Sequence, residues 1–106
     1  MGLIYRLKRK SDFDKLFSKG KKAFTKSLTI LYFPSNDFKI GYSVSKKHGN
    51  AVKRNRIKRL LRASARECFK DLKKNYRIVI MPKIRDNYSF ETFLSEMNYL
   101  KKKENL

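Results

Sequence analysis

The sequence contains very few of the residues on which protein active sites most often depend. It has one cysteine, Cys68, one histidine, His48, and no tryptophan. A single cysteine excludes an internal disulfide and fits a reducing, cytoplasmic setting, and neither residue belongs to a cluster with the spacing of metal ligands. Only nine of the 106 residues are acidic. The composition therefore argues against protein-only catalysis and against a metal centre.

Long apolar segments are also missing. No apolar run approaches the roughly 18 residues of a membrane-spanning helix, and no signal-peptide apolar segment follows the basic start MGLIYRLKRK. There is no internal repeat and no low-complexity linker. We therefore expect one domain over residues 1–106, without a membrane anchor, in which only the basic start and the lysine-rich tail at 101–103 are frayed.

Positive charge is the dominant property of the chain. Lys and Arg number 28 against nine Asp and Glu, so the formal net charge is +19, and the isoelectric point is near 10.3. Since 41% of the residues are hydrophobic and 13% aromatic, the chain can fold despite this charge. A folded domain so basic is typical of proteins that bind a polyanion, most often nucleic acid.

Apolar residues at helical spacing predict a helix near each end of the chain. The first follows the cap Ser11, places Phe13 and Phe17 on one face, and ends near Gly20. The last follows the cap Ser89. Its expected buried stripe is Phe90, Phe93, Leu94, Met97 and Leu100.

Three segments have the character of strands. Residues 28–33, LTILYF, are apolar or β-branched throughout, so both faces of this strand should be covered. Residues 38–45, FKIGYSVS, alternate strictly between apolar and polar, which leaves one face open and polar. Turn residues at 34–37 separate the two, so we expect them to pair as an antiparallel hairpin. A third strand covers residues 76–81, and these elements together predict a small α+β domain.

The central helix is predicted to begin after the cap Asn50 and to reach about Lys74. Six of the ten residues from Lys53 to Arg62 are Lys or Arg, and they surround the first turns of the helix. We therefore expect this end of the helix to project beyond the core. The expected apolar stripe is Ile57, Leu60, Leu61, Ser64, Ala65, Cys68 and Leu72.

Cations at the start of a helix are energetically unfavourable, because the positive end of the macrodipole lies there and each cation costs about 0.3–1 kcal/mol. Repulsion between cations three and four residues apart adds to the cost. A solvated face is the ordinary role of charged helix positions, but a surface selected for solubility would mix charges of both signs. Phosphates would offset both costs. The candidate nucleic-acid contacts are Lys46, Lys47, Lys53, Arg54, Asn55, Arg56, Lys58, Arg59, Arg62 and Arg66.

Aromatic residues near a small polar face suggest a second binding surface. The open face of residues 38–45 carries Ser43, and Phe13, Phe17 and Tyr32 come from neighbouring elements. Such rings can stack on unpaired bases while cations follow the backbone. Packing in the core is the competing interpretation, and the residues alone leave both open.

Four segments of the chain resemble the protein component of bacterial ribonuclease P, and the match covers nearly the whole length. They are FDKLFSKGKK, LTILYF, GYSVSKKHGNAVKRNRIKRLLR and YRIVIMP, and the most specific part is Arg54-Asn55-Arg56 preceded by GYSVSKK and GNAV. The resemblance implies an α+β fold in the order αβββαβα, with three helices on a mixed sheet of about four strands. It also implies a left-handed βαβ crossover, which the usual handedness rule disfavours.

The resemblance also implies a function. Members of this family bind a catalytic RNA, and together they remove the 5′ leader of precursor tRNA. The RNA and its Mg²⁺ perform the hydrolysis, the protein holds no cofactor, and we expect one protein per RNA in the cytoplasm. By position, the basic helix would contact RNA. The leader cleft would be lined by Phe13, Phe17, Tyr32, Ser43 and Lys47.

Two alternatives compete with this interpretation. A ribosomal-type or RNA-chaperone protein without a catalytic partner would explain the charge and the size but not the specific motif. A protein-only nuclease would need an acid–base or metal constellation. The available groups provide none, because Cys68 lies on the apolar stripe, His48 lies in a basic loop, and Asp12 and Asp14 diverge on a helix.

Overall fold

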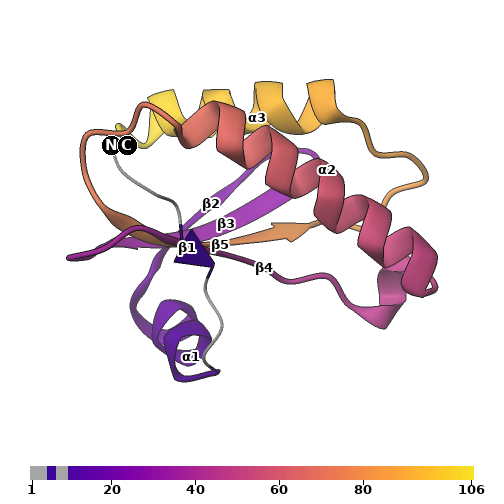
Figure 1. Ribbon diagram of the computed structural model, residues 1–106, viewed down its shortest axis with the longest axis horizontal. Coiled ribbons are helices and arrows are strands. Elements are labelled where there is room, and N and C mark those ends of the chain that lie inside the picture. The colour runs from indigo at the N-terminus through magenta and orange to yellow at the C-terminus, as the bar shows by residue number, and fades with distance from the viewer. Residues whose placement is uncertain (1–4, 7–9) are drawn as a thin grey trace.

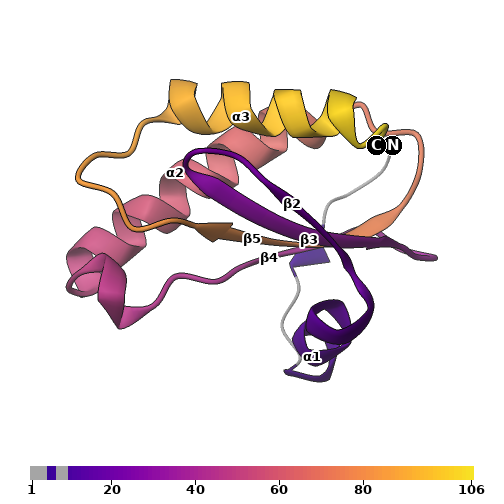
Figure 2. The ribbon, with the colours of Figure 1, turned by 180° about the vertical axis from the view of Figure 1, so that it is seen from behind.

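The computed structural model of the protein describes residues 5–6 and 10–106. Its elements form three layers: α1 covers one face of a mixed sheet, and α2 and α3 cover the other (Figures 1 and 2). The α+β class is thereby confirmed. In chain order the elements are β1 (Tyr5–Arg6), α1 (Lys10–Lys19), β2 (Lys21–Phe24), β3 (Leu28–Pro34), β4 (Lys39–Tyr42), the 3₁₀ helix η1 (Lys46–His48), α2 (Ala51–Phe69), β5 (Tyr76–Pro82) and α3 (Phe90–Lys103).

The sheet has the strand order β1-β4-β5-β3-β2. The expected hairpin of β3 with β4 is wrong, because β5 lies between them, antiparallel to β3 and parallel to β4. In register, Ile80 of β5 pairs with Ile30 on one side and with Tyr42 on the other. The strand YRIVIMP is apolar on both faces, so a central position buries it best. The short edge strand β1 was not predicted, and β2 was implied only by the order αβββαβα of the resemblance, not by a local sequence pattern.

The connection from β4 through α2 to β5 joins two parallel strands. Figure 1 shows β4 running beneath α2, the helix returning above the sheet, and β5 lying on the far side of β4 from the viewer. This path is a left-handed crossover, as the family resemblance implied and against the usual preference. The crossover places the start of α2 beyond the C-terminal end of β4.

The sheet separates two apolar clusters of different size. The main core lies between the sheet and the helices α2 and α3 and includes Ile30, Ile40, Ile78, Leu61 and the fully buried ring of Phe93. The smaller cluster lies on the other face of the sheet. It consists of Leu31 and Val79 with the half-buried Phe33 and Met81.

The central helix is shorter than predicted. It ends at Phe69 rather than near Lys74, although Leu72 is buried as expected. The Nζ of Lys101 donates a hydrogen bond of 2.7 Å to the carbonyl of Cys68 and lies 3.1 Å from Asp71, so α3 satisfies a free carbonyl at the end of α2. The lysines 101–103 form the last turn of α3, which is helical to Lys103, and fraying of this tail stays a prediction.

The outer helices form where they were predicted, but the start of the first is shifted, and of the predicted α3 stripe Phe93, Met97 and Leu100 are buried whereas Phe90 and Leu94 are only partly buried. The first helix begins at Lys10, so Ser11 lies within its first turn and is not its cap. The side chain of Ser89 accepts a hydrogen bond from the Thr92 amide, as predicted for the cap of α3. The expectation that the basic start is frayed concerns mainly residues 1–4 and 7–9, which lie outside the described part of the chain.

Candidate nucleic-acid interface

The start of α2 is built by two local features of the sequence. The side chain of Asn50 accepts a hydrogen bond of 3.0 Å from the Lys53 amide, which confirms the predicted cap. Gly49 has a φ of +123°, and a Cβ there would lie 2.8 Å from the Cδ of Lys53. Only glycine fits this position without strain. The chain therefore turns sharply from η1 into the helix, and the first turn of α2 points away from the core (Figure 1).

The loop before α2 is held by His48. Its Nε2 lies 2.7 Å from the carbonyl oxygen of Pro82, and its Nδ1 accepts from the Ser45 amide at 3.1 Å. A carbonyl can only accept, so the Nε2–H donates this hydrogen bond. His48 thus ties the basic loop to the end of β5.

The basic residues of α2 have no acidic partners. Lys53, Arg56, Arg59, Arg62 and Arg66 are exposed, and Arg54 and Lys58 are half-buried. None of the seven side chains makes an ion pair or a hydrogen bond with any residue that the structure describes. The nearest acids in the sequence, Glu67 and Asp71, pair instead with Lys70 and Lys101. The charge of this surface is therefore left uncompensated within the described protein.

The exposed end of α2 accounts for the distribution of these cations. Val52 is 77% exposed, whereas Ile57 and Leu61 are buried against the sheet. The first turn therefore exposes Val52 to solvent, as expected if this end of the helix projects beyond the core. Asn55 is exposed between the arginines, and Lys46 and Lys47 of η1 extend the same surface. We name these ten residues, from Lys46 to Arg66, the basic surface.

The sheet face covered by α1 is a second, distinct surface. Its floor is Leu31, Gly41 and Val79, which are buried, and Ser43 continues the line of Gly41 beyond the end of β4. The ring of Phe17 on α1 is 52% exposed. An exposed ring at this position can accept a stacking partner, which a core ring cannot. The side chain of Phe13 lies outside the described part of the structure.

The structure places Tyr32 outside the predicted leader cleft. Its ring is buried on the α2 and α3 side of the sheet, where it packs edge-to-face against Tyr76. Its hydroxyl donates a hydrogen bond of 2.5 Å to Glu104. Burial, followed by this hydrogen bond and the charge of Glu104, raises the pKa of the Tyr32 hydroxyl well above its ordinary value. Successive residues of a strand face opposite sides, so the β3 ring that faces α1 is Phe33.

We expect Tyr32→Phe to lower stability without changing RNA binding. The change leaves the Glu104 carboxylate without its donor and should cost about 1.5 kcal/mol, the lower end of the range for bonds to charged groups, because Glu104 is half-exposed. Thermal unfolding should show a Tm lower by roughly 6 °C or more. Loss of precursor tRNA affinity at an unchanged Tm would contradict this placement.

Two aromatic rings on the α1 side of the sheet were not predicted from the sequence. Phe33 is half-buried, with the Nζ of Lys15 5.4 Å from its ring centroid. Phe24 of β2 is 55% exposed, with the Nζ of Lys22 and of Lys83 at 6.0 and 5.7 Å from its centroid. Strict alternation along LTILYF separates Phe33 from Tyr32. It could not show which of the two faces α1 and which faces α2 and α3, because both faces of the strand are apolar.

Metal-binding and thiol chemistry find little support among the described residues. They contain no group of three or more His, Cys, Asp and Glu side chains placed to hold a metal ion. Cys68 is buried, and burial raises the pKa of its thiol to about 11, so its thiolate is scarce at neutral pH. In the same part of the chain, no helix has the length and apolar character needed to span a membrane.

A small basic α+β domain with an uncompensated cationic helix and a sheet face bordered by exposed rings is an RNA-binding protein. The comparisons narrow this class. The Ribonuclease P family model matches residues 1–105. The ribonuclease P protein component of Oceanobacillus iheyensis is 48% identical over 80 residues, which cover 73% of this chain and 66% of that protein. That of Bacillus velezensis is 36% identical over 104 residues, covering 95% and 90%.

Solved structures agree with these relatives. The RNase P protein of Staphylococcus aureus superposes with a TM-score of 0.81 at 26% identity, covering 94% of each chain. The RNase P protein from Thermotoga maritima gives 0.81 at 27% identity, covering 92% of this chain and 96% of that one. The chain belongs to the ribonuclease P protein family. It is thus a subunit of the ribonucleoprotein endoribonuclease that processes tRNA, and its partner is the RNA of that enzyme.

Proposed function

We propose that the chain contacts two RNAs through two surfaces, the catalytic RNA through the basic surface and the 5′ leader of precursor tRNA through the sheet face next to α1. The observation that carries the proposal is the set of seven cations on α2 that have no acidic partner among the described residues. A folded chain tolerates such a cluster at a helix start when phosphates neutralise it.

The basic surface suits a structured phosphate backbone. Arg54, Arg56, Arg59 and Arg62 can each donate two parallel hydrogen bonds to one phosphate, and their backbone is held rigidly by the helix. The cap at Asn50 and the tie from His48 to Pro82 fix the start of the helix before RNA arrives. Little conformational entropy is then lost on binding.

The sheet face suits a single strand. Phe17 offers an exposed ring, and Phe33 and Ser43 are half-buried on the same side of the sheet. Bases can stack on the rings, and Lys15 and Lys22, which lie beside the rings of Phe33 and Phe24, can contact the sugar–phosphate backbone of the RNA. A leader has unpaired bases available for stacking, unlike the paired stem of mature tRNA. This surface would therefore distinguish the precursor from the product.

We assign no chemical step to the side chains of this protein. In the proposed division of labour, the catalytic RNA holds the Mg²⁺ that hydrolysis requires, and the protein positions the leader and strengthens substrate binding. We further propose one protein per RNA and a cytoplasmic place of action, because the substrate would be newly transcribed tRNA.

The test is leader removal by reconstituted enzyme at low Mg²⁺. Adding the chain to the catalytic RNA and precursor tRNA should accelerate release of the leader at Mg²⁺ concentrations at which the RNA alone is slow. The chain alone should cleave nothing. Binding to both RNAs without any acceleration would favour the alternative of an RNA-chaperone or ribosomal-type protein.

We expect Arg59→Ala to weaken binding to the catalytic RNA by about tenfold, since it removes a charge-assisted contact to phosphate. The slope of log affinity against log salt should fall by about 0.7–0.9. Arg59 is exposed and lies off the apolar stripe, so the Tm should not change. Lys73→Ala is the matched control: it removes the same charge beyond the end of α2 and should leave RNA affinity almost unchanged. Equal losses for both variants would mean that net charge, not the basic surface, determines binding.

A further inference from the structure

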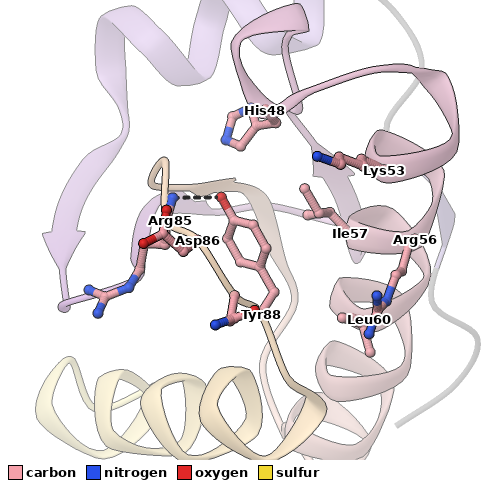
Figure 3. Close-up of a pocket in the computed structure, with 9 residues that line it drawn as sticks. His48, Lys53, Arg56, Ile57, Leu60, Arg85, Asp86 and Tyr88 are labelled. Atoms are coloured by element: carbon pink, nitrogen blue, oxygen red, sulfur yellow. Dashed lines mark hydrogen bonds between the residues drawn. The ribbon is translucent and has the colours of Figure 1, made fainter.

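A pocket of about 270 Å³ lies between the first turns of α2 and the loop that leads into α3 (Figure 3). No residue of α1 or of the sheet lines it. It is therefore distinct from the sheet face assigned to the leader. Its volume falls just below the range of pockets for drug-sized ligands, so it admits one small molecule or one nucleotide rather than a length of strand.

Both walls of this pocket are held in place by hydrogen bonds. On one side, His48 joins the basic loop to the carbonyl of Pro82. On the other, the Tyr88 hydroxyl accepts from the Arg85 amide at 3.0 Å and donates to the Lys83 carbonyl at 2.7 Å. The Tyr88 ring also packs against Phe93 at a centroid distance of 5.6 Å. The pocket is thus largely pre-formed and requires little ordering when a ligand enters.

The lining combines a flat apolar wall with uncompensated cations. The Tyr88 ring stands opposite Ile57 and Leu60 of α2 (Figure 3). Lys53 extends from α2 toward the loop, and Arg56 lies one turn further along the helix; neither pairs with an acid that the structure describes. The guanidinium of Arg85 turns away to the Lys26 carbonyl at 3.3 Å. A planar ring that carries a phosphate matches this arrangement.

Asp86 narrows the choice of ligand. Its carboxylate is exposed at the pocket and makes no ion pair or hydrogen bond within the described residues, although the chain carries 28 cations. A carboxylate would repel a simple anion, but it can accept two hydrogen bonds at once. Guanine offers two adjacent donors on its pairing edge, the ring N–H and the exocyclic amino group, whereas uracil offers one. The carboxylate therefore favours a guanine base over phosphate alone.

We propose that this pocket binds one unpaired guanosine nucleotide of RNA. Its base lies between Tyr88 and the apolar side chains of α2, Asp86 accepts from its pairing edge, and Lys53 and Arg56 contact its phosphate. The inference rests on the proposed function, because a guanosine extruded from the partner RNA is the occupant that such a subunit would meet. Recognition of unpaired bases by stacking and edge contacts is the usual way in which proteins read RNA sequence.

The test is a titration of the ¹⁵N-labelled full chain with guanosine 5′-monophosphate, uridine 5′-monophosphate and inorganic phosphate, followed by NMR. Guanosine monophosphate at millimolar concentration should shift the amide signals of residues 53–57 and 85–88. Its affinity should exceed that of the other two probes by about tenfold, the value of a hydrogen bond to a charged group. Equal affinity for all three would reduce the site to an adventitious anion site and overturn the proposal. Shifts confined to α1 and the sheet would also overturn it.

The decisive variant is Asp86→Asn, which keeps the size of the side chain but exchanges one acceptor for a donor. It should lower the affinity for guanosine monophosphate about tenfold and leave the affinity for phosphate unchanged or slightly higher. Glu67→Gln is the matched control, because it changes the net charge equally on the far part of α2 and should alter neither. A Tm equal to that of the unmodified protein shows that Asp86→Asn is folded. Equal losses in both variants would contradict a specific role for Asp86.

The titration and the leader-removal assay fail independently. The titration uses the free chain, so the absence of guanosine binding overturns only the pocket. Absence of acceleration in the reconstituted enzyme overturns the proposed function and leaves a guanosine-binding pocket whose occupant must come from another RNA.

Discussion

The affinity of the chain for its catalytic RNA is expected to fall about a thousandfold or more between 50 mM and 200 mM monovalent salt. Seven cations of α2 have no acidic partner in the described structure, and the net charge of +19 adds a long-range electrostatic attraction to phosphates. If six of the seven contact phosphate, the release of bound counterions produces a loss of this size. The measurement is an equilibrium binding titration at fixed Mg²⁺ over this range of salt.

Two variants serve as controls for the slope of affinity against salt. Arg59→Ala should reduce the slope, whereas Tyr32→Phe should leave it unchanged because Tyr32 is buried away from the basic surface. A slope near zero would show that the cations of α2 are only a solvated face, and the assignment of the basic surface would then be wrong.

Phe17→Ala is expected to weaken binding of precursor tRNA by the assembled enzyme while leaving the affinity for mature tRNA almost unchanged. Stacking of one base on an aromatic ring contributes about 1–3 kcal/mol, which corresponds to a loss of about 5- to 150-fold. Mature tRNA lacks the leader and cannot use the ring. Because the Phe17 side chain is 52% exposed, its removal opens no closed cavity, and the Tm should change little.

Phe93→Ala provides the matched comparison. The Phe93 ring is fully buried in the main core, so the same truncation should cost about 3–5 kcal/mol of folding free energy. Binding of both RNAs should then suffer alike through loss of folded protein. If Phe17→Ala behaves in this way, with equal losses for the two RNAs, Phe17 is a packing residue and the leader does not lie beside α1.

The positions of caps and apolar stripes could be read from the sequence because they depend on residues close together in the chain. Asn50 and Ser89 cap α2 and α3, and Ile57, Leu61 and Cys68 are buried together. The end of α2 could not be read in this way. Helical spacing continued to Leu72, but the helix ends at Phe69, where Lys101 from a distant part of the sequence contacts the last turn.

The pairing of strands was beyond local patterns for a related reason. The turn at 34–37 favoured a hairpin, and nothing near it indicates that β5, more than 30 residues later, occupies the place between β3 and β4. The burial of β5 on both faces decides the order, and this benefit appears only when α1, α2 and α3 cover the sheet. The error at Tyr32 has the same origin, because alternation defines two faces of β3 but does not say which helices cover each.

The sequence by itself determined the class of this protein and the location of its charge. The excess of 28 cations over nine acids, and their concentration at the start of one helix, follow from composition and order alone. Only the tertiary structure decided which rings are exposed, where Phe33 and Tyr32 point, and that loop 83–89 closes a pocket against α2. These features depend on contacts between segments far apart in the chain, and such contacts are selected by the burial of the whole core rather than by any local pattern.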